Sequence, residues 1–143
     1  MSEIDLLKKY PKSKRPLDER KSNVTDAMRE ISRKFDKEYF DGDRMYGYGG
    51  YEYNERFWYE TVRIFYDHYN MHDNFSILDV GCGKGFMMYE FLKLNPKLKI
   101  KGIDISNYAK KNAHENIKDL IEVGNVTDLP YESKKFDLII SIN

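Results

Sequence analysis

Residues 76–85, SILDVGCGKG, decide the fold of this chain. An apolar run ends at Val80 and is followed by Gly81, Gly83 and Gly85, which is typical of a buried strand that turns directly into a helix. Glycines at such a turn accept positive φ and let backbone N–H groups approach a ligand, because no side chain blocks the way. A glycine triplet alone equally suits a tight turn without a ligand.

Short apolar segments alternate with helix-forming segments beyond Asn74, and this alternation predicts the fold class. Strands alternating with helices pair in parallel through right-handed crossovers, so we expect an α/β, doubly wound parallel sheet. The expected strands cover 75–80, 98–105, 120–123 and 136–142, and the expected helices cover 86–94 and, after a Ser106 cap, 108–117. The last strand, FDLIISI, reads as buried on both faces, so the sheet is expected to continue beyond these four strands.

The chain before the sheet divides into two parts by composition. Residues 1–22 are rich in Lys, Arg and Ser and contain prolines, which indicates a flexible basic arm. Residues 23–73 form a helical extension, with one amphipathic helix expected over 24–40, a Tyr/Gly-rich loop over 41–54, and a second helix over 55–71. Residues 74–143 are then the first half of the sheet domain.

Charge and composition narrow the classes of partner. The 24 basic and 24 acidic residues cancel, so no net field favours a nucleic-acid backbone or an anionic membrane, and a small-molecule acceptor is expected. The sequence lacks a long apolar stretch and a secretory signal pattern, which predicts a soluble, cytoplasmic protein. One cysteine and three scattered histidines predict neither a disulfide nor a metal site. The oligomeric state is left open.

The spacing after the turn favours an adenosyl ligand over a bound phosphate. Asp104 ends the second expected strand, close to the roughly 20-residue spacing of a ribose-binding acid. A dinucleotide fingerprint would need glycine or alanine where Phe86 stands, and a P-loop would need Ser or Thr after Lys84, where Gly85 stands. Both phosphate-centred interpretations are therefore weakened.

Three segments in order, ILDVGCGKG, GIDIS and GNVTDLPYESKKFDLIISIN, resemble the successive cofactor motifs of class I S-adenosylmethionine-dependent methyltransferases. The resemblance covers residues 74–143 and implies a Rossmann-like fold, S-adenosylmethionine as cofactor, and in-line methyl transfer. It also implies that Asp79 and the turn from Gly81 to Gly85 hold the methionine part of the cofactor. Asp104 would then accept both ribose hydroxyls. The thiol of Cys82 is expected to fill the turn without chemistry of its own, because no base lies near it in sequence.

The adenine and sulfonium positions follow from the same resemblance. Ile105 would pack on the adenine, and the Val126 N–H would reach a ring nitrogen. Asn125 stands where the family usually has an acid, and its carbonyl oxygen can still accept the adenine amino proton, although it could equally make a turn. Ser141 and Asn143 would lie beside the sulfonium. The implied cofactor-binding residues are Asp79, Gly81, Cys82, Gly83, Gly85, Asp104, Ile105, Asn125, Val126 and Ser141.

The Tyr/Gly-rich segment is a second candidate site. Glycines permit motion and tyrosines offer rigid stacking faces, so Tyr46, Tyr48 and Arg56 suit a lid over cofactor or acceptor, or equally a packed surface loop. No general base is singled out, because methyl transfer depends mainly on alignment. A non-catalytic adenosyl-binding or partner-binding module, and an aminopropyl-transfer enzyme on the same scaffold, remain alternatives.

Overall fold

The computed structural model describes residues 3–12 and 23–142. Four strands form one sheet in the order β3-β2-β1-β4, and every neighbouring pair is parallel. Leu78 of the central strand stands opposite Lys101 on one side and Ile139 on the other. The strands are β1 (Ser76–Val80), β2 (Lys99–Asp104), β3 (Ile121–Val123) and β4 (Leu138–Ile140). The predicted parallel α/β sheet is confirmed.

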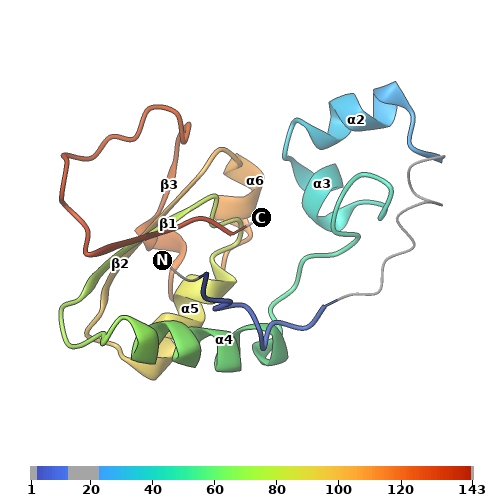
Figure 1. The fold of residues 1–143 in the computed structure, drawn as a ribbon. Helices are drawn as coiled ribbons and strands as arrows, with labels where there is room; N and C mark the ends of the chain where they lie inside the picture. Colours follow the sequence, from blue (N-terminus) through green and yellow to red (C-terminus); the bar gives the residue numbers. More distant parts are fainter. Residues whose placement is uncertain (1–2, 13–22, 143) are drawn as a thin grey trace.

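The two faces of the sheet are covered differently. Helices α4 and α5 lie together along one side, whereas residues 124–137, which contain no helix or strand, run along the other side (Figure 1). No helix in the described parts of the chain is long and apolar enough to cross a membrane. The helices are α2 (Asp26–Ser32), α3 (Lys37–Asp41), α4 (Glu55–His68), α5 (Phe86–Leu94), α6 (Asn107–Lys111) and the 3₁₀ turn η1 (Lys118–Leu120).

The main apolar core lies between the sheet and the α4–α5 pair. Ile77 of β1 and Ile100 of β2 are buried there against Trp58, Val62 and Phe91. Burying one such side chain contributes about 1.5–3 kcal/mol. This core therefore anchors β1 and α5, and with them the glycine turn that joins the two.

The prediction of a single helix over 24–40 is wrong. The chain forms α2 and α3 instead, because Phe35 adopts a positive φ of 49° and the Asp36 side chain caps the next helix by accepting the Lys37 N–H at 2.9 Å. Helix α2 buries none of its residues, and α3 buries Phe40. The break lets α3 carry Phe40 and Asp41 to the sheet domain.

A flexible arm was expected over residues 1–22, but residues 3–12 pack against the rest of the chain. Leu6 and Leu7 lie against the apolar core, and the Tyr10 ring centroid is 5.6 Å from Phe57 and 5.1 Å from Trp58. The remainder of the expected arm, residues 13–22, lies outside the described residues.

Of the two helices predicted after the glycine turn, α5 has the expected length and α6 is shorter than expected. Helix α5 has the predicted bounds, and the Ser106 side chain caps α6 as expected by accepting the Ala109 N–H at 3.0 Å. Helix α6 nevertheless ends at Lys111, well before the predicted end at Ile117. The chain between α6 and β3 turns inward and buries Ile117 completely.

Candidate functional site

The glycine turn lies at the carboxyl edge of the sheet. Gly81, Gly83 and Gly85 have φ values of 75°, 56° and 71°, a left-handed region that glycine enters without strain. The Gly81 and Cys82 N–H groups donate to the Ile103 carbonyl oxygen at 2.8 and 3.3 Å, and Gly85 N–H donates to the Cys82 oxygen at 2.9 Å. Backbone hydrogen bonds to β2 therefore hold the turn in shape.

The turn is open on one side and packed on the other. A Cβ atom on Gly81 would meet nothing within 4 Å, and this glycine is exposed. A Cβ on Gly83 would lie 3.4 Å from the Tyr51 ring, and one on Gly85 would collide with the Ile117 side chain. The open space beside the turn therefore lies at Gly81.

Asp79, in β1, precedes the open Gly81 by two residues and is only 6% exposed. Burial, and secondly the neighbouring Asp104 carboxylate, raise the pKa of Asp79 to about 7, and no hydrogen bond from the described residues counteracts them. A buried carboxylate is costly unless a cation or hydrogen-bond donors accompany it. Asp79 thus suits a ligand that brings a cationic donor group.

Asp104 ends β2 and retains acceptor capacity. Its Oδ2 accepts the Gly83 N–H at 2.7 Å, and its Oδ1 accepts the Ser106 N–H at 2.8 Å. A carboxylate has roughly four acceptor positions, so each oxygen can accept one more hydrogen bond. Two neighbouring hydroxyl groups, such as those of a ribose, fit this arrangement.

Exposed apolar side chains follow β2 and β3 at the same edge. Ile105 is 53% exposed and Val126 is 46% exposed, so both offer surface to a flat apolar ring. The Asn125 Oδ1 accepts the Thr127 N–H at 3.0 Å, which is the turn-forming role that the sequence left open. One acceptor position on that oxygen remains.

Ser141 is exposed just after β4 and lines a groove with residues 3–7. Asn143, expected beside it, lies outside the described residues. Within the described parts of the chain, no three His, Cys, Asp or Glu side chains are grouped to hold a metal ion.

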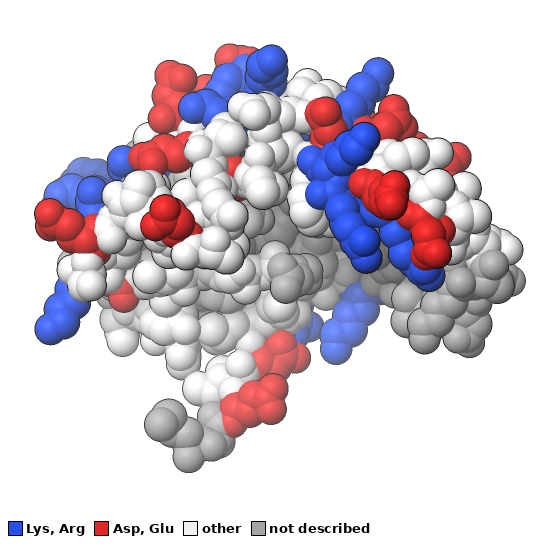
Figure 2. Space-filling view, turned by 90° about the horizontal axis from the view of Figure 1, so that it is seen from above, with Lys and Arg blue, Asp and Glu red and all other residues white. Residues whose placement is uncertain are grey.

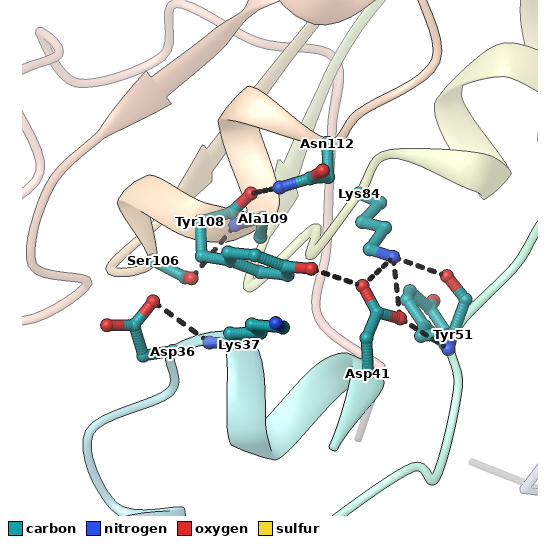
Figure 3. A network of polar contacts seen from close by, with 9 residues as sticks. All are labelled: Asp36, Lys37, Asp41, Tyr51, Lys84, Ser106, Tyr108, Ala109 and Asn112. Atoms are coloured by element: carbon teal, nitrogen blue, oxygen red, sulfur yellow. Dashed lines mark hydrogen bonds and ion pairs between the residues drawn. The ribbon is translucent and has the colours of Figure 1, made fainter.

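A buried ion pair closes the other side of the turn, and the sequence did not reveal it. The Lys84 Nζ donates to Oδ1 and Oδ2 of Asp41 at 2.9 and 2.7 Å and to the Tyr51 carbonyl oxygen at 2.8 Å (Figure 3). The Tyr51 N–H and the Tyr108 hydroxyl donate to the same carboxylate at 2.9 and 2.7 Å. Burial would raise the pKa of Asp41, but these hydrogen bonds hold it below its usual value. The sequence did contain one signal, a lysine between two glycines in a crowded turn. A buried lysine needs an acceptor as partner, but the sequence does not show which residue that is.

The structure brings one of the three expected lid residues to this turn. The Tyr48 ring stacks on Phe40 at 5.9 Å and lies 4.3 Å from Tyr51, which covers Gly83. Tyr46 lies in the preceding turn, and Arg56 lies in the first turn of α4 with its guanidinium 5.1 Å over the ring of the next residue. A lid role for these residues stays a prediction.

Comparison with known proteins identifies the family. The model of a family described as a methyltransferase domain matches residues 71–143. The ribosomal protein L11 methyltransferase of Ruminiclostridium cellulolyticum is 36% identical over 89 residues, which cover 57% of this chain and 28% of that protein. The tRNA U34 carboxymethyltransferase of Nautilia profundicola is 38% identical over 80 residues, which cover 52% of this chain and 26% of that protein. The chain belongs to the methyltransferase domain family, and the resemblance seen in the sequence is confirmed.

The fold extends this likeness to most of the chain. A crystal structure of coclaurine N-methyltransferase bound to N-methylheliamine and SAH superposes with a TM-score of 0.51 at 16% identity, covering 90% of this chain and 43% of that one. At this identity the likeness concerns the Rossmann-like fold alone. The chain spans about a quarter of the length of the two curated relatives.

Proposed function

We propose that this chain is the S-adenosylmethionine-binding part of a methyltransferase that acts on a small-molecule acceptor. The observation that carries the proposal is the pair of buried carboxylates, Asp79 and Asp104, beside an open glycine turn. The cofactor has an ammonium group and two adjacent ribose hydroxyls. The ammonium matches the unpartnered Asp79, and the hydroxyls match the remaining acceptor positions of Asp104.

The surrounding residues fit the rest of the cofactor. Gly81 faces open space and leaves room for the methionine chain, with Cys82 behind it in the turn. Ile105 would pack on the adenine, the Val126 N–H would reach a ring nitrogen, and the Asn125 oxygen would accept the adenine amino proton. Ser141, at the end of β4, would lie beside the sulfonium.

When bound, S-adenosylmethionine supplies a methyl group on a sulfonium, ready for in-line displacement by a nucleophile. The residues of this chain would contribute orientation, and near-attack geometry can contribute roughly 7–11 kcal/mol. Buried carboxylates around a fixed turn are suited to that task because they would hold the cofactor on both sides of its sulfonium, at the methionine ammonium and at the ribose.

The small-molecule acceptor is inferred from charge. The two curated relatives are named for a ribosomal protein and a tRNA, so family membership leaves the acceptor class open. The basic and acidic side chains are equal in number, and on the face shown in Figure 2 they lie side by side. On that face, and among the described residues, basic side chains alternate with acidic ones, unlike the basic stripe that follows a nucleic-acid backbone. We therefore expect a low-molecular-weight acceptor, methylated in the cytoplasm.

Calorimetric titration with S-adenosylhomocysteine tests the site. Asp104→Ala removes two charge-assisted hydrogen bonds to the ribose, so affinity should fall by about 100-fold or more. Asp119→Ala removes an exposed carboxylate before β3 and should leave affinity unchanged. Equal affinities for Asp104→Ala and the unaltered chain would show that the site is misassigned.

A labelling experiment tests the acceptor class. The protein is incubated with methyl-labelled S-adenosylmethionine and a cell extract, which is then separated into protein, RNA and low-molecular-weight fractions. We expect the label in the low-molecular-weight fraction. Label in protein or RNA would contradict the acceptor assignment, and binding without any transfer would favour the non-catalytic module.

A further inference from the structure

The Lys84–Asp41 pair is saturated by the chain itself. An ammonium has three donors, and Lys84 directs hydrogen bonds to both Asp41 oxygens and to the Tyr51 carbonyl. The roughly four acceptor positions of the carboxylate are taken by Lys84, the Tyr51 N–H and the Tyr108 hydroxyl. The two side chains are only 7% and 24% exposed. The pair therefore offers no hydrogen bond to a ligand. Its contacts are all with other parts of the chain.

The Lys84–Asp41 pair holds the Tyr/Gly-rich loop (residues 41–54), called the Tyr/Gly loop below. Both backbone polar groups of Tyr51 are bound to the pair, which fixes its ring over Gly83 and 4.8 Å from Phe86, the first residue of α5. Burial chiefly raises the pKa of the Tyr51 hydroxyl, and Asp79 also contributes to that rise. Tyr51 therefore lies on the packed side of the turn, with its ring against Gly83 and Phe86.

The pair adds to the backbone hydrogen bonds that hold the turn. Gly83 and Gly85, which flank Lys84, are both left-handed, and glycine readily leaves that conformation because no Cβ restricts it. The Gly83 N–H donates to Asp104 Oδ2 at 2.7 Å. A shift of the turn would therefore also move the carboxylate assigned to the ribose.

We propose that Asp41 and Lys84 are positioning residues of the cofactor site. Their ion pair holds the Tyr/Gly loop on the glycine turn and so fixes the Gly83 N–H that orients Asp104. The loop then acts as a fixed wall of the site, in contrast to the mobile lid suggested by its glycine content. The ligand in this inference rests on the proposed function, but the position of the turn is measurable without a ligand.

Amide hydrogen exchange in the ligand-free chain measures the turn directly. The variants are Asp41→Asn, Lys84→Met and the double variant, and the reporters are the hydrogen-bonded amides of Gly83 and Gly85. Each single variant should speed exchange at both amides by about tenfold, the factor expected for losing roughly 1.4 kcal/mol of local protection. The double variant should add little, because either change alone breaks the pair.

Lys93→Met is the matched control. Lys93 binds Glu55 at 2.6 Å and the Tyr53 hydroxyl at 3.1 Å, so it also ties this segment to α5, but it does not contact the turn. Exchange at the two glycine amides should be unchanged in this variant. Should Asp41→Asn fail to fold, Lys84→Met decides the outcome, because methionine suits a buried position.

Titration with S-adenosylhomocysteine separates positioning from simple stabilisation. Affinity should fall by about tenfold in both single variants and no further in the double variant, with Lys93→Met unaffected. Unchanged exchange in Asp41→Asn and Lys84→Met would overturn the proposal. Faster exchange with unchanged affinity would also overturn it, because the pair would then be structural only. If the unaltered chain fails to bind the ligand, the proposed function is wrong, and the exchange rates still decide whether the pair holds the turn.

Discussion

The two sides of the glycine turn use carboxylates in opposite ways. On the packed side, Asp41 accepts hydrogen bonds from Lys84, Tyr51 and Tyr108, which hold its pKa low despite burial. On the open side, Asp79 is buried near Asp104 without such partners, and its pKa rises to about 7. One carboxylate has its hydrogen-bond partners within the chain, whereas the other lacks them and is the one for which we propose a ligand. Hydrogen-bond partners, and not residue type, therefore distinguish the structural acid from the acid proposed to bind a ligand.

The largest stability effect is expected on the packed side. Gly85→Ala combines left-handed strain with overpacking against the buried Ile117, and should lower the free energy of unfolding by about 3 kcal/mol. Gly81→Ala carries the strain alone and should cost about 1 kcal/mol. Urea denaturation of both variants measures the difference. Equal costs would mean that the two sides of the turn are packed alike.

An intermediate effect, with a distinctive pH dependence, is expected at Asp79. Its pKa in the folded chain exceeds the ordinary value of 3.8, so the folded state holds a proton that the unfolded state releases between these values. Stability is therefore lost as pH rises through this window, by about 2 kcal/mol between pH 5 and pH 8 relative to Asp79→Asn. Urea denaturation of both proteins across this range measures the loss.

Ligand affinity should follow the opposite trend at Asp79. Deprotonation creates the charge that the ligand ammonium needs, so affinity for S-adenosylhomocysteine should rise between pH 5 and pH 8 in the unaltered chain. In Asp79→Asn this rise should be absent. A parallel rise in both proteins would place the titrating group elsewhere.

The smallest effect is expected at the exposed surface of Ile105, which we propose packs on the adenine. Ile105 is half exposed, so Ile105→Ala should change the free energy of unfolding by no more than about 0.5 kcal/mol. Loss of its contact with the adenine should weaken S-adenosylhomocysteine binding by about three- to tenfold, measured by calorimetry. A large loss of stability with unchanged affinity would show that Ile105 belongs to the core.

Local patterns predicted the elements around the turn well. The segment from Ser76 to Leu94 forms the expected strand, turn and helix, because an apolar run, a glycine turn and helix formers follow one another directly. The same reasoning failed over 24–40, where regular apolar spacing concealed a left-handed Phe35 and an Asp36 cap. Periodicity reports which residues could share a face, but a cap and one positive φ are enough to end a helix.

The sequence by itself determined the class of sheet, the glycine turn, and the placement of Asp79 and Asp104 at the carboxyl edge, because each depends on order along the chain. Only the tertiary structure decided which side of the turn is open, since Asp41 and Tyr51 reach Lys84 from a distant loop, and Tyr108 reaches Asp41 from α6. Hydrogen bonds between such segments depend on how α3 and α6 pack on the sheet. The spacing of residues along the chain does not predict that packing.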